Sequence, residues 1–128
     1  MELKQFKIYI DNKTSELARV SDAIGKVGIN IKAIVSEGAV MEPFVKLVTN
    51  DVATTERALK SQGFSYELKE ILDIELHDRP GELSKVAKKL ARAGVQVESL
   101  YILGQKDGKT EVALVVDDLA AARKALSV

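Results

Sequence analysis

The chain lacks cysteine and tryptophan altogether, and it has one histidine among its 128 residues. Without cysteine there is no disulfide framework, no thiol nucleophile and no cysteine-based zinc site. A lone histidine, His77, without a second ligand or a nearby nucleophile favours neither metal binding nor catalysis. We therefore expect no metal, no cofactor, no catalytic residue and no enzyme activity, and the missing disulfides fit a cytoplasmic protein.

An excess of charge of one sign is also missing, because 19 basic side chains balance 19 acidic ones. A neutral chain has no long-range attraction to nucleic acid or to an anionic membrane. Three Phe and three Tyr residues that do not cluster are a poor platform for stacking RNA bases. Apolar runs fall short of the roughly 20 residues that span a bilayer, and Met1–Lys7 lacks the apolar segment of a signal peptide. We expect a soluble protein without nucleic-acid or membrane partners.

What the sequence does contain is a repeat. The segment Ile8–Leu17 returns as Ile74–Leu83, and the register then holds without a gap. Val20 aligns with Val86, Ile24 with Leu90, Gly28 with Gly94, Ile31 with Val97, and Ile34 with Leu100. The repeat assigns residues 1–70 to a first module and residues 71–128 to a second. Because each copy is small, we expect each to depend on its twin for burial.

Each copy predicts a strand, a helix, two strands and a second helix. In the first copy, polarity alternates from Phe6 to Ile10, and apolar residues then recur at helical spacing from Leu17 to Val27 before Gly28. Its other elements are strands at 29–35 and 44–49, a weaker helix that Gly63 ends, and a candidate fourth strand at 64–68. The second copy predicts strands at 72–76, 95–102 and 111–116, with helices at 83–90 and 119–126. Asp107-Gly108 is a hairpin signal between two of these strands.

This order predicts an α+β fold of two ferredoxin-like βαββαβ modules side by side, each an antiparallel sheet with both helices on one face. The second copy ends at Val128 without a candidate fourth strand. Either that module closes with three strands, or the neighbouring first copy completes its sheet. We also expect a homodimer through the helix-free sheet face. The residues expected on that face are Ile34, Phe44, Val48, Leu100, Ile102 and Val115, interspersed with Lys46 and Glu98.

The segment Asp78–Leu83 (DRPGEL) opens a helix whose end runs into Ala93–Val97 (AGVQV). This pattern resembles the ACT domain, a βαββαβ module of proteins that regulate amino-acid metabolism. In the first copy, Asn12–Leu17 followed by Val27–Ile31 resembles a diverged version of the same pattern. The resemblance covers essentially the whole chain and implies a stand-alone tandem ACT protein.

The resemblance further implies an amino acid bound where two modules meet, between the loop of one and the second-strand entry of the other. The loop matches the family pattern in the second copy, and the strand-entry asparagine stands in the first. The implied site is Asn30, Ile31, Asp78, Arg79, Pro80, Gly81, Glu82 and Leu83. The first copy's loop departs from the pattern at Thr14 and Ser15, and Gln96 replaces the asparagine. A weaker second site therefore comprises Asn12, Ser15 and Gln96.

The residue types suit a zwitterion. Gly81 lets a ligand approach the backbone, and Pro80 fits the first turn of a helix. Free N–H groups at the helix start would receive a carboxylate, while Asp78 would accept hydrogen bonds from an ammonium group. Arg79 would hold a ligand carboxylate or lie in solvent. Ordinary turn and cap chemistry explains the same residues structurally, and the sequence leaves both interpretations open.

We therefore predict a non-catalytic, allosteric regulatory protein that binds an amino acid between its two modules and passes the signal to a partner enzyme or through self-association. The alternative is an interaction subunit of an amino-acid biosynthetic enzyme that no longer binds a ligand. The diverged loop of the first copy favours this alternative, and the intact loop of the second opposes it.

Overall fold

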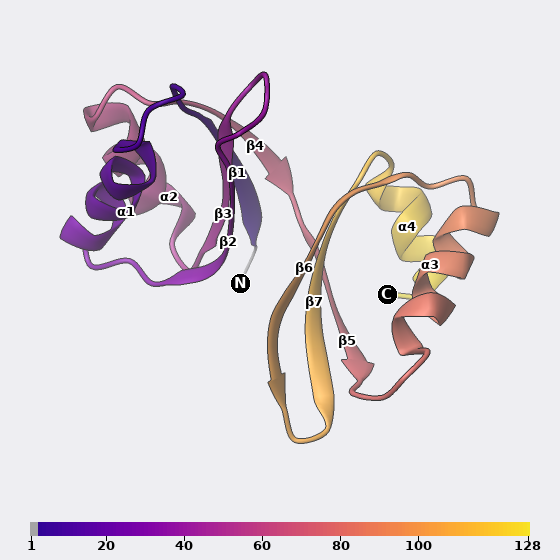
Figure 1. Ribbon diagram of the computed structural model, residues 1–128. Helices are drawn as coiled ribbons and strands as arrows, with labels where there is room; N and C mark the ends of the chain where they lie inside the picture. The colour runs from indigo at the N-terminus through magenta and orange to yellow at the C-terminus, as the bar shows by residue number, and fades with distance from the viewer. Residues whose placement is uncertain (1–2) are drawn as a thin grey trace. The chain divides into compact units, whose positions relative to one another are not determined.

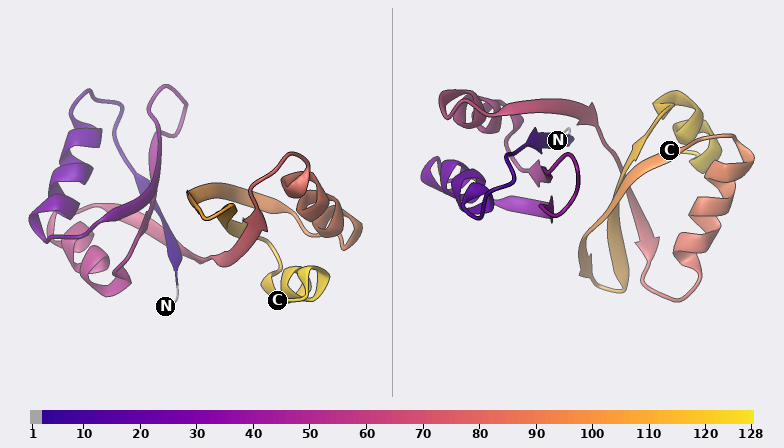
Figure 2. Two further views of the ribbon diagram at one scale, coloured as in Figure 1. Left: turned by 90° about the horizontal axis from the view of Figure 1, so that it is seen from below. Right: turned by 45° about the horizontal axis from the view of Figure 1, so that its top comes forward.

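The computed structural model describes residues 3–128, which form two antiparallel sheets and four helices. The chain divides into two compact units, Met1–Glu70 (unit 1) and Ile71–Val128 (unit 2) (Figure 1). In each unit both helices pack on one face of that unit's own sheet (Figure 2). The α+β class and the ferredoxin-like organisation of both copies are confirmed.

Unit 1 has the complete βαββαβ order. Its elements are β1 (Lys4–Tyr9), α1 (Glu16–Lys26), β2 (Ile31–Glu37), β3 (Phe44–Thr49), α2 (Val52–Ser61) and β4 (Ser65–Glu70). The sheet order is β2-β3-β1-β4, and every neighbouring pair is antiparallel. The candidate fourth strand is therefore a real edge strand, paired with β1.

The core of unit 1 forms where the helices cover the sheet. Alternate residues of β1 and β3 point to one face, as strand geometry requires, and meet the apolar stripes of α1 and α2. The innermost side chains are Phe6, Ile8, Val20, Ile24, Val45, Leu47 and Leu59. β4 adds Tyr66, whose ring lies 5.7 Å from that of Phe6.

Unit 2 repeats this plan without the fourth strand. Its elements are β5 (Leu72–His77), α3 (Glu82–Arg92), β6 (Val97–Lys106), β7 (Lys109–Val116) and α4 (Leu119–Leu126). The sheet order is β5-β7-β6, so of the two alternatives the three-stranded sheet is the one observed. Asp107 and Gly108 both have positive φ, 53° and 73°. This confirms the predicted two-residue hairpin turn.

Leu126, the equivalent of Leu59, is only partly buried, but at six other positions the core of unit 2 matches that of unit 1. Its most buried side chains are Leu72, Ile74, Val86, Leu90, Val112, Leu114 and Ala122. Gly28 and Gly94, predicted to end the first helix of each copy, have φ of 71° and 72°. A left-handed residue at these positions closes the helix without the steric cost that a Cβ would add.

Three residues expected on the helix-free face lie on the opposite, helix-covered face. Directly paired residues of antiparallel strands share a face, and all three pair with core residues of the next strand. Ile34 pairs with Leu47, Leu100 with Leu114, and Ile102 with Val112. The prediction for these three residues was therefore wrong.

The physical reason is a β-bulge in β2 and another in β6. The register shifts between Ile31 and Ala33 in β2 and at the equivalent place, between Val97 and Ser99, in β6. A bulge adds one residue to its strand, so the alternation of faces changes phase beyond it. Simple counting along the sequence then assigns the later residues to the wrong face.

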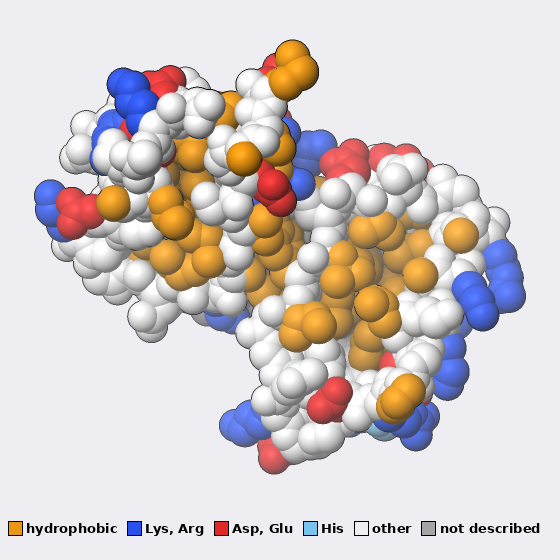
Figure 3. Space-filling model, viewed as in Figure 1, with side chains coloured by type: hydrophobic (Ala, Val, Ile, Leu, Met, Phe, Trp, Pro, Cys, Tyr) orange, Lys and Arg blue, Asp and Glu red, His pale blue; other side chains and the backbone are white. Residues whose placement is uncertain are grey.

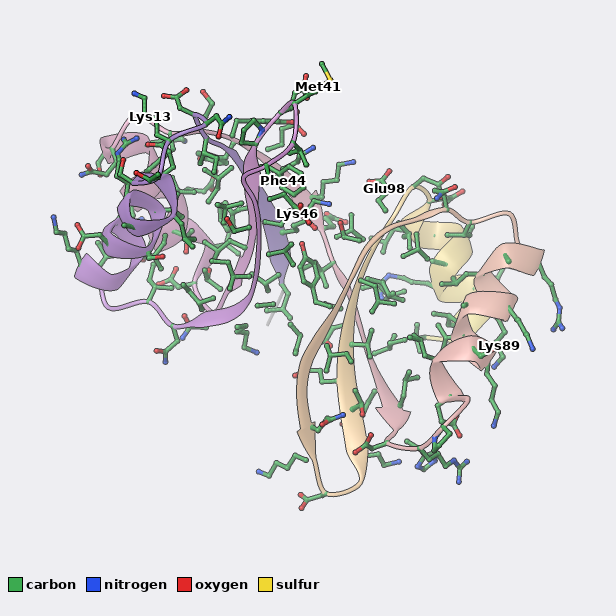
Figure 4. The ribbon with its side chains drawn as sticks, viewed as in Figure 1. Lys13, Met41, Phe44, Lys46, Lys89 and Glu98 are labelled. Atoms are coloured by element: carbon green, nitrogen blue, oxygen red, sulfur yellow. The ribbon has the colours of Figure 1, made fainter. Side chains whose placement is uncertain are left out.

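Phe44, Val48 and Val115 do lie on the helix-free faces of their sheets, as their pairing partners show. Phe44 and Lys46 leave β3 on the side turned away from α1 and α2 (Figure 4). The ammonium groups of Lys7 and Lys46 lie 5.0 and 5.3 Å from the centre of the Phe44 ring. With fewer apolar members than expected on this face, a homodimer through it stays a prediction.

Candidate functional site

The loop between β5 and α3 forms one wall of a pocket of about 180 Å³ within unit 2. The facing wall is β6, and the floor comes from β5 and β7. The lining residues are Leu76, His77, Asp78, Arg79, Glu82, Leu83, Leu100, Ile102, Gln105, Thr110 and Val112. Four of the site residues predicted from the sequence, Asp78 and Arg79 of the loop and Glu82 and Leu83 of α3, therefore line one pocket.

Gly81 gives this loop its shape. Its φ of +87° is left-handed, and no atom lies within 4 Å of the position that a Cβ would take. The open space is compatible with close approach of a ligand, while the left-handed φ is itself sufficient reason for glycine. Helix α3 begins only at Glu82, so Pro80 lies in the preceding turn. The expectation that Pro80 belongs to the first helical turn was wrong.

The loop is tied to the hairpin turn between β6 and β7. The Asp78 N–H donates to the Gly108 carbonyl oxygen at 2.8 Å. The Asp78 carboxylate also accepts a hydrogen bond from Gln105 Nε2 at 3.3 Å. Asp78 is thus held by both its backbone and its side chain, at one end of the pocket.

Glu82 binds the basic residues of the loop region. Arg79 Nε donates to the Glu82 carboxylate, and Lys85 Nζ donates to the same oxygen at 3.4 Å. The Arg79 guanidinium holds the pKa of the Glu82 carboxyl below its ordinary value. Neither interpretation offered for Arg79 included this pairing, and a ligand carboxylate would compete with Glu82 for that guanidinium.

The other end of the pocket is apolar. Leu83 of α3 and Leu100 and Ile102 of β6 are 43%, 39% and 59% exposed, although the two β6 residues lie on the helix-covered side of the sheet. Helix α3 does not reach over the edge strand β6, so these side chains stay open to solvent. Figure 3 shows hydrophobic side chains at the surface along β6. The pocket therefore joins a hydrogen-bonded carboxylate at one end to aliphatic side chains at the other.

The equivalent loop of unit 1 is built differently. Ser15 has a φ of −92°, where Gly81 is left-handed. The next residue, Glu16, buries its carboxylate, which accepts hydrogen bonds from the Asp11 N–H at 3.1 Å and from Arg19 Nη1 at 2.8 Å. The Arg19 hydrogen bond, supported by that from the Asp11 amide, lowers the pKa of the Glu16 carboxyl. In unit 1, the Glu16 carboxylate thus accepts the hydrogen bond of a loop amide.

The two equivalent glutamates, Glu16 and Glu82, also line hollows on different sides of their helices. Glu16 lines a hollow of about 260 Å³ with Phe64 and Ser65, next to β4. Glu82 faces β6 instead. Sequence reasoning missed Glu16, because a charged residue in the first turn of an amphipathic helix is usually solvated. The spacing of Glu16 and Arg19, three residues apart on a helix, was the available signal.

The remaining predicted residues lie at strand entries and in the unit 1 loop. Asn30 is exposed just before β2, and Ile31 opens that strand at 38% exposure. Asn12 is exposed in the loop before α1. Gln96 is exposed at the entry to β6, and its N–H donates to Asp117 Oδ1 at 2.9 Å. Asn30 belongs to unit 1 and Asp78 to unit 2.

His77 is exposed, and its Nδ1 lies 3.1 Å from Lys109 Nζ. Across residues 3–128, no group of three or more acidic or histidine side chains gathers as a metal ion would require. None of the helices in that range is long and apolar enough to cross a membrane.

Nearly the whole chain matches one family model, and several solved structures share its fold. The family model described as an ACT domain pair matches residues 1–125. Among solved structures, protein BT0572 from Bacteroides thetaiotaomicron is 24% identical, with a TM-score of 0.87 over 99% of this chain and 88% of that one. The ligand-free regulatory subunit of aspartate kinase from Thermus thermophilus is 16% identical, with a TM-score of 0.71 over 98% of this chain and 91% of that one.

A third structure, the regulatory subunit of aspartate kinase from Thermus flavus, is 14% identical, with a TM-score of 0.63 over 99% of this chain and 92% of that one. No curated protein sequence matches the chain significantly. The duplicated fold and the family match agree over nearly the entire length, and the chain belongs to the family of ACT domain pairs.

Proposed function

We propose that this protein is a non-catalytic regulator that binds an amino acid at the β5–α3 loop of unit 2. The observation that carries the proposal is the pocket described above, polar at Asp78 and apolar along β6. ACT domains are regulatory modules, and two of the structures named above are regulatory subunits of aspartate kinase.

The pocket chemistry supports one orientation of the ligand. The α-ammonium group would donate to the Asp78 carboxylate beside Gln105, since a carboxylate is an acceptor only. The α-carboxylate would lie at the start of α3, where backbone N–H groups and the helix dipole favour an anion and Gly81 leaves room. An apolar ligand side chain would then contact Leu83 and Leu100.

We further propose, from the family pattern, that Asn30 of unit 1 completes this site. The weaker second site would comprise Asn12 and Ser15 with Gln96. It would have to form beside a loop in which the Asp11 N–H already donates to the Glu16 carboxylate. A ligand at that place would compete with a buried carboxylate of the protein itself. We therefore expect one principal ligand per chain.

A thermal-shift screen of the twenty amino acids tests the proposal most directly. A ligand at a hundred times its dissociation constant adds about 2.7 kcal/mol to the free energy of unfolding. Asp78→Asn should abolish the shift, because it removes the charge that receives the ammonium group. The matched control is Asn12→Ala at the equivalent position of unit 1, which should keep it. Equal loss in both variants would contradict the assignment of the site to unit 2.

The role of Asn30 has its own test. Asn30→Ala and Gln96→Ala change equivalent exposed positions, so the two substitutions should affect folding to the same extent. Calorimetric titration of the ligand found in the screen should show the larger loss of affinity for Asn30→Ala. Equal losses, or none for Asn30→Ala, would remove Asn30 from the site.

One ligand that residues of both units hold would regulate a partner by favouring one relative orientation of the two units. Linkage requires that the ligand has different affinities for the two states.

A second candidate function is an interaction subunit that no longer binds a ligand. The closed loop of unit 1 favours it, because that copy already fills its own loop with Glu16. The absence of any thermal shift across the twenty amino acids would support this second function and refute the first.

A further inference from the structure

Thr110, in the central strand β7, brings a hydroxyl group to the floor of the unit 2 pocket. The residue is 8% exposed, so it is more than nine-tenths buried. It pairs with Leu76 of β5 on one side and with Gln105 of β6 on the other. Directly paired residues share a face, and all three line the pocket, so their side chains form one row across the sheet.

The Thr110 hydroxyl has no hydrogen-bond partner among residues 3–128. The buried threonines of unit 1 differ in this respect. Thr55 and Thr49 share a hydrogen bond of 2.8 Å, and Thr55 also donates to the Asp51 carbonyl oxygen at 2.6 Å. In the described part of the chain, every side-chain N or O atom that is closed off from solvent has a partner. The Thr110 oxygen is therefore open to solvent, and the pocket that this residue lines is where it opens.

The equivalent position of unit 1 carries no such group. Ile10 is the counterpart of Leu76, and its N–H donates to the Pro43 carbonyl oxygen at 3.2 Å, so Pro43 lies where unit 2 has Thr110. Proline has no hydrogen-bonding side chain. The copy whose loop amide is bound by Glu16 thus lacks the hydroxyl, and the copy with the open pocket has it.

Gln105 connects Thr110 to Asp78. Its Nε2 donates to the Asp78 carboxylate at 3.3 Å, and a carboxylate only accepts, so the nitrogen of this amide is the atom that faces Asp78. Within residues 3–128, the Gln105 amide oxygen has no donor bound to it. Three neighbouring residues at the polar end of the pocket, Asp78, Gln105 and Thr110, therefore carry acceptor oxygens.

We propose that these three residues select a primary α-ammonium group, so that the pocket takes amino acids with an unmodified amino group and rejects N-alkylated ones, proline included. The inference rests on the proposed function, which places the ammonium group at Asp78. A primary ammonium group has three N–H donors, one for each of the three acceptors. An N-alkyl group removes one donor and leaves one acceptor unpaired, and an unpaired buried acceptor is unfavourable. Asp78 supplies the charge, and Thr110 and Gln105 determine the specificity.

The free protein tests whether the hydroxyl is unpartnered. Thr110→Val keeps the branched shape and removes only the hydroxyl, so the melting temperature without amino acid should not fall. The matched control is Thr55→Val, which removes a buried hydroxyl with two partners and should lower the melting temperature. Equal falls in the two variants would show that the Thr110 hydroxyl serves the fold, and would overturn the proposal.

Binding is tested with the full chain, the twenty L-amino acids, and the N-methyl derivative of the amino acid that gives the largest thermal shift. Calorimetric titration should show the N-methyl derivative binding at least about tenfold more weakly than its parent. Thr110→Val should weaken the parent amino acid about tenfold, the effect of one hydrogen bond to a charged group, and Thr110→Ser should restore most of the affinity. Unchanged affinity in Thr110→Val, or a largest shift from proline, would overturn the proposal.

Combining the two changes identifies the ligand group that Thr110 contacts. In Thr110→Val, two acceptors remain for the two N–H groups of the N-methyl derivative, so N-methylation should weaken binding much less than it does in the natural protein. An equal effect of N-methylation in both proteins would place Thr110 against another part of the amino acid, and the proposal would be wrong.

Asp78→Asn separates this inference from the proposed function. If Asp78→Asn abolishes binding while Thr110→Val and N-methylation leave it unchanged, the amino acid binds in unit 2 without this selection, and only the present inference fails. If none of the twenty amino acids gives a thermal shift, the proposed function and this inference fail together.

Discussion

Replacing Glu16 with glutamine removes the charge from a carboxylate that unit 1 buries against its own loop. The Glu16 side chain is 5% exposed, and it accepts hydrogen bonds from Arg19 at 2.8 Å and from the Asp11 amide at 3.1 Å. A hydrogen bond to a charged group contributes about 1.5–3 kcal/mol. Because the Arg19 side chain is 48% exposed, water screens much of the stabilisation that its ion pair with Glu16 contributes.

Glutamine keeps one acceptor oxygen, so the amide bond survives in weaker form. We therefore expect Glu16→Gln to lower the free energy of unfolding of unit 1 by about 1 kcal/mol. The matched control is Glu82→Gln. Its partners, Arg79 and Lys85, are 61% and 66% exposed, so water screens both ion pairs. A smaller loss should follow there.

The effect of Glu16 has a definite pH dependence. Its pKa in the folded protein is lowered from the ordinary value of 4.5. A lowered carboxyl pKa stabilises the folded state fully above that ordinary value, and the stabilisation is lost as pH falls through the folded pKa. The advantage of the natural protein over Glu16→Gln should thus be complete at neutral pH and should vanish in strong acid.

Urea unfolding at neutral and acid pH measures both differences. The Asp11 amide proton gives an independent signal, because its chemical shift should follow ionisation of Glu16 with a midpoint below the ordinary carboxyl range. Equal losses in Glu16→Gln and Glu82→Gln would refute the reasoning. So would a stability difference that persists where all carboxyl groups are protonated.

Two further predictions compare equivalent positions of the units. Gly81→Ala should destabilise unit 2 by about 1 kcal/mol, since φ of +87° strains any residue with a Cβ, while Ser15→Ala, at a φ of −92°, should change thermal unfolding little. Leu59→Ala should cost about 2–5 kcal/mol because its side chain is fully buried. Leu126→Ala, where the side chain is only partly buried, should cost less than half as much, and equal losses in urea unfolding would show that α4 is buried as deeply as α2.

The duplication made most of the fold predictable. Alternation in β1 and β5, the helical stripes before Gly28 and Gly94, and the Asp107-Gly108 turn each depend on local geometry that the sequence states directly. A single copy would have left several of these elements uncertain, whereas two copies in one register support each other.

The faces of the edge strands were not predictable in the same way. No glycine or proline marks the bulges after Ile31 and Val97 in the sequence. Each bulge changes which residues face the helices. As a result, the exposed side chains of Leu100 and Ile102 lie beside the β5–α3 loop and line the pocket there. The polar half of the candidate site could be read from the sequence, and the apolar half required the bulge.

The two units thus share one fold but differ in the structure of the loop before their first helix. In unit 1, a serine with ordinary φ precedes Glu16, whose carboxylate turns in to the Asp11 amide. In unit 2, left-handed Gly81 precedes Glu82, whose carboxylate binds Arg79 and leaves the loop beside β6 open. Since a buried carboxylate and a bound ligand cannot use the same amide donors, a copy that closes its own loop is free to diverge. The departures at Thr14 and Ser15 are what such a copy would accumulate.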